Sequence, residues 1–417
     1  MALETRVLTA DEWDVWFDHL ELAFGGVPEL SEERELCKSL TELTRSLGVW
    51  DGGQCVGSAG AFSFRLSVPG GGALVPAAGV TMVGVSPTHR RRGVLTSLMR
   101  RQLDDIRAGG EPLAVLTASD PAIYGRFGYG TAAYSVSVDI DTTRVRLSVP
   151  PGTDDVRLRL VDPLESLPDC ERVYAALVAG RPGMPARQPG WELRALVDPP
   201  SGRSAASPLK CVVAEGAGGE VVGYARYHVK PDWEQTGSDG KVQLRTLEAL
   251  DPAAYAALWR YLFDIDLAWR VRAYGRPVDD PVLHMVSDVR RAEVRQRDAL
   301  HLRLVDLPAA LEARGYGAPL DVVFEVEDRF CPWNAGRWRL TATAGGTAGG
   351  GTASCTRTGA PAELELSAGE LGAAYLGGVT LASLAAAGRV RELRAGTLVQ
   401  ASRAFAGDVA PWLSHGF

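Results

Sequence analysis

A pattern of strands and a helix occurs twice in this chain, and it constrains the fold more than any other feature. Residues 49–66, VWDGGQCVGSAGAFSFRL, surround an Asp-Gly-Gly turn and predict a hairpin of two strands. Residues 211–229, CVVAEGAGGEVVGYARYHV, have the same pattern. In each copy a further strand then runs into an amphipathic helix, over 83–108 and over 242–265. We therefore predict an internal duplication.

The chain is long enough for more than the two copies. Its 417 residues predict about three domains. A linker rich in Pro, Gly and Asp follows the first copy at 146–155, and the pattern changes again from Asp298. The stretch 71–87 predicts a pair of strands, and the glycine-rich stretch 345–355 predicts a turn. The sequence thus predicts an α/β (α+β) chain with domains at 1–145, 146–297 and 298–417.

Composition narrows the classes of function. The formal net charge of −7 argues against a broad nucleic-acid surface and suits the attraction of cationic small molecules. No signal peptide and no run of about 18 apolar residues is present, so we expect a cytoplasmic protein without a membrane span. The six cysteines stand far apart without a CxxC pair, which argues against a zinc ribbon and predicts free thiols. We expect no metal.

Three adjacent arginines, Arg90 to Arg92, stand between a strand and the start of a helix. The N-terminus of a helix is the positive end of its dipole and repels cations. Three arginines at this position therefore predict a bound anion. Free N–H groups of a first helical turn bind phosphate oxygens, Gly93 lets the backbone approach a ligand, and arginines bind pyrophosphate bidentately. The loop lacks the GxxxxGK(S/T) of a nucleoside-triphosphate site, and GYGTAA at 128–133 precedes a strand, which excludes a dinucleotide fingerprint. The alternative is a basic helix start that only faces solvent.

The segment Arg90-Arg91-Arg92-Gly93-Val94, after an apolar strand, resembles the pyrophosphate loop of the GNAT acyl-CoA-dependent N-acyltransferases. Three motifs in order narrow the resemblance: PTHRRRG at 87–93, YGRFGYG at 124–130 and LPAALEARGY at 307–316. Together they look like the Eis (enhanced intracellular survival) family of GNAT N-acetyltransferases over essentially the whole chain. The resemblance implies a catalytic GNAT domain, a degenerate GNAT domain that has lost the arginines, and a C-terminal domain similar to sterol carrier proteins.

The resemblance also implies acetyl-CoA as the acyl donor, held by the arginine loop and by backbone groups of the preceding strand. The residues that it assigns to acetyl-CoA are Val83, Gly84, Val85, Arg90, Arg91, Arg92, Gly93, Val94, Leu95, Thr96, Ser119 and Asp120.

Two groups correspond to the family's catalytic acid and base. Tyr124, the first tyrosine of the heptad, would protonate the leaving thiolate, since a phenol with a pKa near ~10 suits that task. The α-carboxylate of Phe417, the last residue, would accept the proton of the amine. On position alone Tyr124 could equally be a core tyrosine and the tail could fray. Tyr129 is the weaker candidate for the acid, and we assign His415 to packing or to the surface.

Trp13, Phe24, Met82 and Asp298 are expected to line a pocket for the amine, although an aromatic helix stripe is more often core. Some relatives carry acidic residues where this chain has Gly26 and Gly416. We therefore expect a weaker hold on polycationic aminoglycosides.

The function predicted is acetyl-CoA-dependent N-acetylation of primary amines of small molecules, with aminoglycosides and lysine side chains as candidate acceptors. The family resemblance implies a homo-oligomer, a hexamer. The negative net charge argues against a nucleic-acid partner, and the lack of a long apolar run argues against a membrane partner. The alternative is a non-catalytic protein that binds acyl-CoA or an apolar ligand through the carrier-like domain.

Overall fold

The computed structural model describes residues 3–235, 237–345 and 351–417. The chain forms two compact units. Unit 1 comprises Met1–Ala133, Arg181–Ala186 and Asp298–Phe417, and unit 2 comprises Tyr134–Gly180 and Arg187–Arg297. Of the turn predicted at 345–355, residues 346–350 lie outside the described residues.

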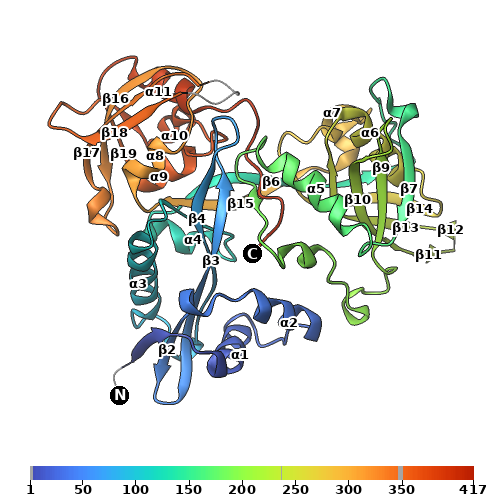
Figure 1. Cartoon of the computed structure of the whole chain (residues 1–417), viewed down its shortest axis with the longest axis horizontal. Helices are drawn as coiled ribbons and strands as arrows, with labels where there is room; N and C mark the ends of the chain where they lie inside the picture. The colour runs from blue at the N-terminus through green and yellow to red at the C-terminus, as the bar shows by residue number, and fades with distance from the viewer. Residues whose placement is uncertain (1–2, 236, 346–350) are drawn as a thin grey trace. The chain divides into compact units, whose positions relative to one another are not determined.

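Unit 1 contains the first copy of the repeat, on a sheet with the strand order β1-β2-β3-β4-β5-β15 (Figure 1). The hairpin predicted at 49–66 is confirmed, since β2 and β3 pair antiparallel across the Asp-Gly-Gly turn. The pair of strands predicted at 71–87 is wrong: a single strand, β4, stays paired with β3 from end to end. The strands are β1 Glu4–Val7, β2 Leu47–Asp51, β3 Gln54–Ser67, β4 Leu74–Val85, β5 Leu113–Leu116 and β15 Arg295–Leu304.

Helices cover both faces of this sheet (Figure 1). A Cβ on Gly84 would lie 3.1 Å from Ala23 of α1, whereas a Cβ on Gly57 would lie 2.9 Å from Val94 of α3. Gly84 pairs with Ser58, the neighbour of Gly57, so α1 and α3 lie on opposite faces. The helices of this segment are α1 Trp13–Ala23, α2 Ser31–Leu40, α3 Val94–Ala108 and α4 Pro121–Tyr124.

Unit 2 repeats the strand–helix–strand arrangement. Strands β13 and β14 pair in parallel with α6 between them in the chain, as β4 and β5 do around α3. Parallel strands need such a crossover, so the shared topology agrees with the predicted duplication. The sheet runs β6-β14-β13-β10-β9-β7. Its elements are β6 Gly130–Asp141, β7 Arg157–Val161, β9 Lys210–Glu215, β10 Val221–Lys230, β13 Gly240–Ala249, β14 Ala268–Pro277, α5 Leu167–Val178, α6 Pro252–Phe263 and α7 Val282–Met285.

The last segment forms a second sheet of unit 1, in the order β18-β17-β16-β19-β20. One apolar core contains Leu66 and Val75 of the first segment together with Phe324 and Phe405 of the last, which explains why both belong to one unit. The elements are β16 Leu320–Glu327, β17 Gly336–Ala342, β18 Ala353–Arg357, β19 Leu364–Ser367, β20 Arg391–Glu392, α8 Leu307–Glu312, α9 Ala368–Ala374, α10 Leu381–Ala386 and α11 Thr397–Phe405.

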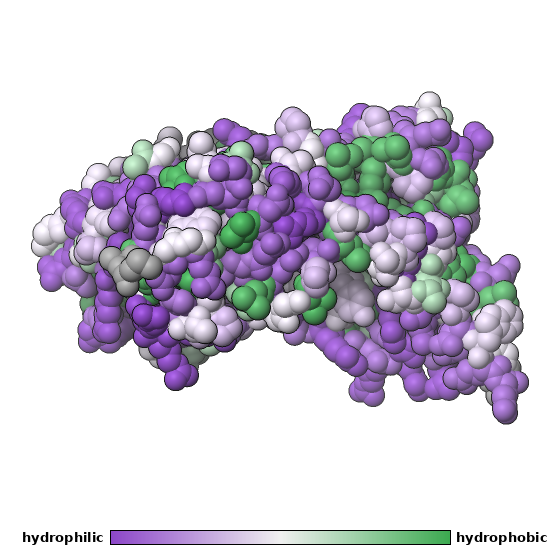
Figure 2. Space-filling view, turned by 90° about the horizontal axis from the view of Figure 1, so that it is seen from below, coloured by the Kyte–Doolittle hydropathy of each residue, from purple (hydrophilic) through white to green (hydrophobic). Residues whose placement is uncertain are grey.

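Polar residues cover much of the face shown in Figure 2, and apolar residues form separate groups on it. All six cysteines are free, as predicted. In the part of the chain that the structure describes, no helix combines the length and apolarity needed to cross a bilayer. Over the same residues, no group of three or more His, Cys, Asp and Glu side chains is arranged to hold a metal ion.

Candidate active site

The arginine loop leads from β4 into α3. Arg90, Arg91 and Arg92 are exposed, and their guanidinium groups have no hydrogen-bond or ion-pair partner among the described residues. Below them His89 is buried and anchors the loop, since its Nε2 lies 3.2 Å from the Asp51 carboxylate. Three exposed cations that pair with none of the residues the structure describes are placed to meet an anion from outside the chain.

The start of α3 is open to a ligand. Gly93, at the N-cap, has a φ of +83°, and no atom lies within 4 Å of a Cβ built on it. The first turn that follows, Val94 to Thr96, has N–H groups without intrahelical acceptors. Arg91 also has a positive φ, +60°, which is uncommon for an arginine. Free N–H groups, a backbone without a side chain and three cations together fit a pyrophosphate.

Strand β4 changes its pairing just before this loop. Its parallel pairing with β5 ends at Gly79, opposite Val115, so the rest of β4 has no β5 partner. Against β3 the register shifts between the pairs Gly60–Thr81 and Ser58–Gly84. Such a shift is a β-bulge, with Met82 at a φ of +52°. Residues Val83 to Val85 therefore follow a bulge on a strand whose β5 side is unpaired, where backbone groups can bind an extended arm. No sequence pattern predicts the positive φ of Met82.

Tyr124 ends the short helix α4, just after β5. Asp120 caps that helix by accepting a hydrogen bond from the Ala122 N–H at 3.0 Å. Burial raises the pKa of the Tyr124 phenol, and the nearby Asp120 carboxylate raises it further. The phenol is therefore protonated at neutral pH, as a general acid requires. Ser119 and Asp120 are exposed on the segment that leads into this helix.

The second tyrosine of the heptad has a different environment. Tyr129 is buried with its ring 6.0 Å from that of Tyr124, and its hydroxyl has no hydrogen-bond partner among the described residues. Burial also raises the pKa of Tyr129. A phenol closed off in this way packs the core and cannot reach a substrate without rearrangement.

Beneath the heptad lies a buried ion pair that the sequence did not reveal. Arg303 of β15 donates to the Asp328 carboxylate at 2.6 Å, and both side chains are buried. A Cβ on Gly128 would overlap the Arg303 guanidinium, so glycine is needed there for packing as well as for its φ of +81°. The ion pair therefore fixes the turn that carries Tyr124. Gly128 was visible in the heptad, but nothing in the sequence linked it to Arg303.

Phe417 does not fray. Its ring packs edge-on against Phe64 of β3, with 5.0 Å between the ring centroids. A Cβ on Gly79 of β4 would lie 3.3 Å from the same ring. Gly79 is also the residue at which β4 and β5 part. The C-terminal residue thus reaches the point on the sheet where the β4–β5 gap begins.

A short segment from the middle of the chain holds the C-terminal tail there. The Trp412 N–H donates to the Pro182 carbonyl at 2.8 Å, and Arg181 donates to the Ala410 carbonyl at 3.1 Å. Strand β8, Pro185–Ala186, follows and pairs with the end of β3. These contacts explain why residues 181–186 belong to unit 1. The sequence contains no periodic signal for so short a strand.

The residues expected around the amine lie in different environments. Trp13 is 1% exposed, and its indole N–H donates to the Thr41 hydroxyl at 3.0 Å, so its side chain is part of the core. Met82 packs against the same apolar cluster as Trp13. Phe24 is 60% exposed, just after α1. Asp298 lies 2.8 Å from His301 Nε2 at the start of β15. The structure brings Trp13 and Met82 together in one cluster, and Phe24 and Asp298 are not part of it.

Three family models match the chain in order. Residues 4–132 match an acetyltransferase (GNAT) domain, residues 183–304 match another acetyltransferase (GNAT) domain, and residues 307–414 match a sterol carrier protein domain. The chain is 64% identical over 417 residues to an uncharacterized N-acetyltransferase of Streptomyces avermitilis, with all of both chains covered. It is 36% identical over 378 residues to the N-acetyltransferase Eis of Mycobacterium tuberculosis, covering 87% of this chain and 86% of that protein.

Comparison of the fold with solved structures agrees with these sequence matches. The crystal structure of Eis1 from Mycobacterium abscessus superposes with a TM-score of 0.81 at 33% identity and covers 100% of both chains. The chain belongs to the Eis family of GNAT N-acetyltransferases. The predicted resemblance and the predicted fold class, two GNAT domains followed by a sterol-carrier-like domain, are therefore confirmed.

Membership of the Eis family establishes the class of reaction. The chain is an acetyltransferase, and GNAT acetyltransferases use acetyl-CoA as acyl donor. The alternative prediction, a non-catalytic protein that only binds acyl-CoA or an apolar ligand, is therefore rejected. In the second GNAT domain of this Eis-family chain, Asp251 and Pro252 begin α6 where the first domain has its arginines. An aspartate that caps a helix already satisfies its N–H groups and repels a phosphate.

Proposed function

We propose that the protein transfers the acetyl group of acetyl-CoA directly to a primary amine of a small molecule, with Tyr124 as general acid and the Phe417 carboxylate as base. The observation that supports the proposal is that the rings of both residues pack near the point where β4 and β5 part. Phe417 packs at Gly79, and Tyr124 belongs to the apolar cluster that contains Val80 and Leu116. We further propose the domain boundaries 1–145, 146–297 and 298–417 for the catalytic, degenerate and carrier-like parts.

The arginine loop would hold the pyrophosphate of acetyl-CoA. Arg90, Arg91 and Arg92 supply unpaired donors, and the open backbone from Gly93 to Thr96 supplies N–H groups. Val83 to Val85 would bind the pantetheine arm through their backbone. Ser119 and Asp120 would border the arm from the β5 side.

In the reaction the neutral amine attacks the thioester carbonyl carbon. A C–N bond forms, the C–S bond breaks, and the thiolate takes the phenolic proton of Tyr124. The excess proton of the amine goes to the Phe417 carboxylate. A terminal carboxylate has a pKa of ~3.5 in water, and its desolvation in the closed site raises that pKa and makes it a better base. The products are an amide and the free thiol of CoA.

The acceptor side of the proposal rests on the region around Trp13, Phe24, Met82 and Asp298. The net charge of −7 favours cationic amines, including lysine side chains. Gly26 and Gly416 provide no carboxylates, so aminoglycosides should be slow acceptors. We also propose a cytoplasmic homo-oligomer, a hexamer, which mass determination in solution tests directly.

One assay tests the function. The full chain is mixed with acetyl-CoA and a panel of amines that contains alkyl amines, lysine peptides and aminoglycosides, and free thiol is followed. We expect thiol release that depends on the amine and equals the amount of acetylated product. Thiol release that is the same without any amine would contradict the proposed transfer.

A further inference from the structure

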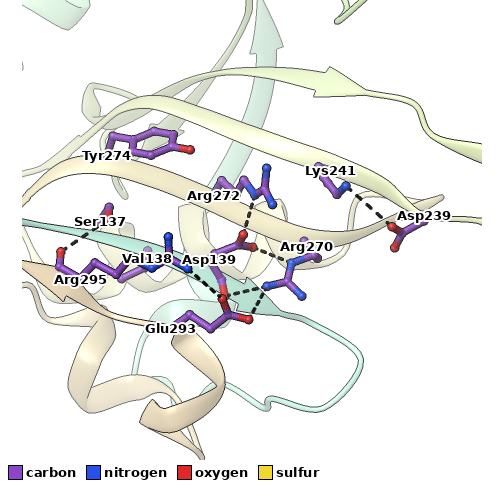
Figure 3. Close-up of a pocket in the computed structure, with 10 residues that line it drawn as sticks. All are labelled: Ser137, Val138, Asp139, Asp239, Lys241, Arg270, Arg272, Tyr274, Glu293 and Arg295. Carbon is purple, nitrogen blue, oxygen red and sulfur yellow. Dashed lines mark hydrogen bonds and ion pairs between the residues drawn. The ribbon is translucent and has the colours of Figure 1, made fainter.

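One face of the unit 2 sheet is polar and carries three arginines and a lysine among carboxylates. Along β14, Arg270, Arg272 and Tyr274 alternate with Val271 and Ala273, which are buried in the core. Side chains at alternate positions of a strand share a face, so the first three project from the side opposite the core. A pocket of about 480 Å³ lies on this face (Figure 3), a volume within the range of small-molecule sites. It is lined by Ser137, Val138, Asp139, Asp239, Lys241, Arg270, Arg272, Tyr274, Glu293 and Arg295.

A network of ion pairs holds the floor of this pocket. The Asp139 carboxylate accepts hydrogen bonds from Arg270 and from Arg272, both at 2.6 Å. Arg270 also donates from Nη2 to Glu293 at 2.8 Å, so two of its three guanidinium nitrogens are engaged (Figure 3). Arg272 is different, because it uses only Nε. Its two terminal nitrogens have no hydrogen-bond partner among the described residues.

Two further cations of the pocket are only loosely paired. Lys241 Nζ lies 3.6 Å from Asp232 and 3.7 Å from Asp239, beyond hydrogen-bond distance. The Arg295 side chain is 80% exposed and 3.8 Å from Glu293. Over the whole lining, four cations face three carboxylates. The Asp232 carboxylate, which lies outside the lining, balances the fourth cation, so an anion would be attracted by the free donors of the pocket and not by a net charge.

An aromatic ring stands beside these cations. Tyr274 is 68% exposed, although a tyrosine of this kind on a sheet normally packs against a neighbour. It lies where the pairing of β14 with β6 shifts between Ala273 and Arg276, and the next residue, Gly275, has a φ of +65°. A bulge of this kind re-aims a side chain. Here it leaves the ring free to stack on a ligand.

We propose that this pocket binds a small aromatic phosphate, a molecule that carries a phosphoryl group on a planar ring. The free terminal nitrogens of Arg272, with Lys241 and Arg295, would bind the phosphoryl oxygens, since a guanidinium matches phosphate geometry. The ring of Tyr274 would stack on the planar part. The site belongs to unit 2 and uses none of the arginines at the start of α3.

The test is calorimetric titration of the full chain with phenyl phosphate while saturating CoA occupies the arginine loop. We expect one saturable site. Because a hydrogen bond to a charged group contributes about 1.5–3 kcal/mol, Arg272→Ala should weaken binding by about tenfold or more. Arg295→Ala, which removes an exposed side chain, should weaken it by a smaller factor and without loss of fold.

Two further variants distinguish binding by the Tyr274 ring from binding by the cations of the pocket. Tyr274→Ala should weaken phenyl phosphate and leave inorganic phosphate unchanged. Arg157→Ala is the matched control, because Arg157 is an exposed arginine of β7 outside the pocket, and it should bind like the parent chain. The proposal is overturned if the parent chain binds no phenyl phosphate at millimolar concentration, or if Arg272→Ala and Arg157→Ala bind alike.

Discussion

At the scale of single residues, Tyr124 and Tyr129 are only five positions apart in the sequence, yet their phenols have different environments and different chemical roles open to them. Both belong to one heptad, and their rings are in edge-on contact. Tyr124 ends a short helix after β5, whereas the Tyr129 hydroxyl is enclosed without a partner. The sequence could rank them only through the family resemblance, since burial depends on residues such as Arg303 that are distant in the chain.

Tyr124→Phe should lower kcat by about 100-fold, because general acid catalysis contributes a factor of this order. KM for acetyl-CoA should change little, since the ring remains. Tyr129→Phe is the control. It removes a buried hydroxyl without a partner, so the free energy of unfolding should stay the same or rise by about 1 kcal/mol, with kcat unchanged. Steady-state kinetics and thermal unfolding of both variants test the assignment, and a reversed order of kcat would refute it.

The pH dependence of kcat follows from the environment of Tyr124. Burial and Asp120 raise the pKa of the phenol above its usual value near ~10. The active, protonated form therefore persists through neutral pH and is lost only as the pH rises through the raised pKa. A pH profile of kcat should show no loss due to Tyr124 below about pH 10. A basic limb near pH 8 that Tyr124→Phe abolishes would contradict the role of general acid.

At the scale of elements, the start of α3 shows what one glycine contributes. Gly93→Ala keeps the arginines but forces a Cβ onto a backbone with a φ of +83° and into the open space for a phosphate. KM for acetyl-CoA should rise by about tenfold, since the variant loses charge-assisted hydrogen bonds. Kinetics with varied acetyl-CoA measure the effect.

Gly396→Ala is a matched control for Gly93→Ala. Gly396 is the N-cap of α11 with a φ of +88°, and no atom lies within 4 Å of a Cβ built on it. Both variants should lose about 1 kcal/mol of stability from the same backbone strain. Only Gly93→Ala should change KM. An equal rise of KM in both variants would mean that strain, and not the phosphate site, is responsible.

The C-terminal tail can be tested without changing its packing. One glycine added after Phe417 keeps the ring against Phe64 and moves the carboxylate away. We expect kcat to fall by about 100-fold, the order of magnitude of general base catalysis. Phe417→Leu retains the carboxylate and should lower kcat by a smaller factor. Rates that are normal in the extended chain would show that the carboxylate is not the base.

Elements with a strong periodic signal were predictable, and short or irregular ones were not. The helix at 94–108 has apolar residues on one face after a glycine N-cap, so its position followed from local sequence. The bulge at Met82 did not, because a methionine with a positive φ is imposed by pairing with β3. Strand β8 at Pro185–Ala186 is too short for any pattern, yet it helps to hold the C-terminal tail.

At the scale of the whole molecule, the proposed catalytic groups come from the first and the last segment of the chain and belong to one unit. The first and last segments share an apolar core, and residues 181–186 cross from the middle segment to join them. The sequence predicted three segments in order, but such grouping depends on contacts between residues hundreds of positions apart. Unit 2 has an apolar core of its own.

The division of the chain into two units predicts which unit acetyl-CoA binds and stabilises. A ligand stabilises the part of the protein that binds it, by about 2.7 kcal/mol at a concentration 100 times its Kd. With CoA bound, hydrogen exchange should slow in β4 and at the start of α3 and should stay unchanged in β10 and β13 of unit 2. Mass spectrometry of peptides from the exchanged protein measures both regions in one experiment, with Gly93→Ala as the weakened control. Protection that is strongest in β10 and β13 would place the CoA site in the second GNAT domain, and the arginine loop would then need another anion to explain its three unpaired cations.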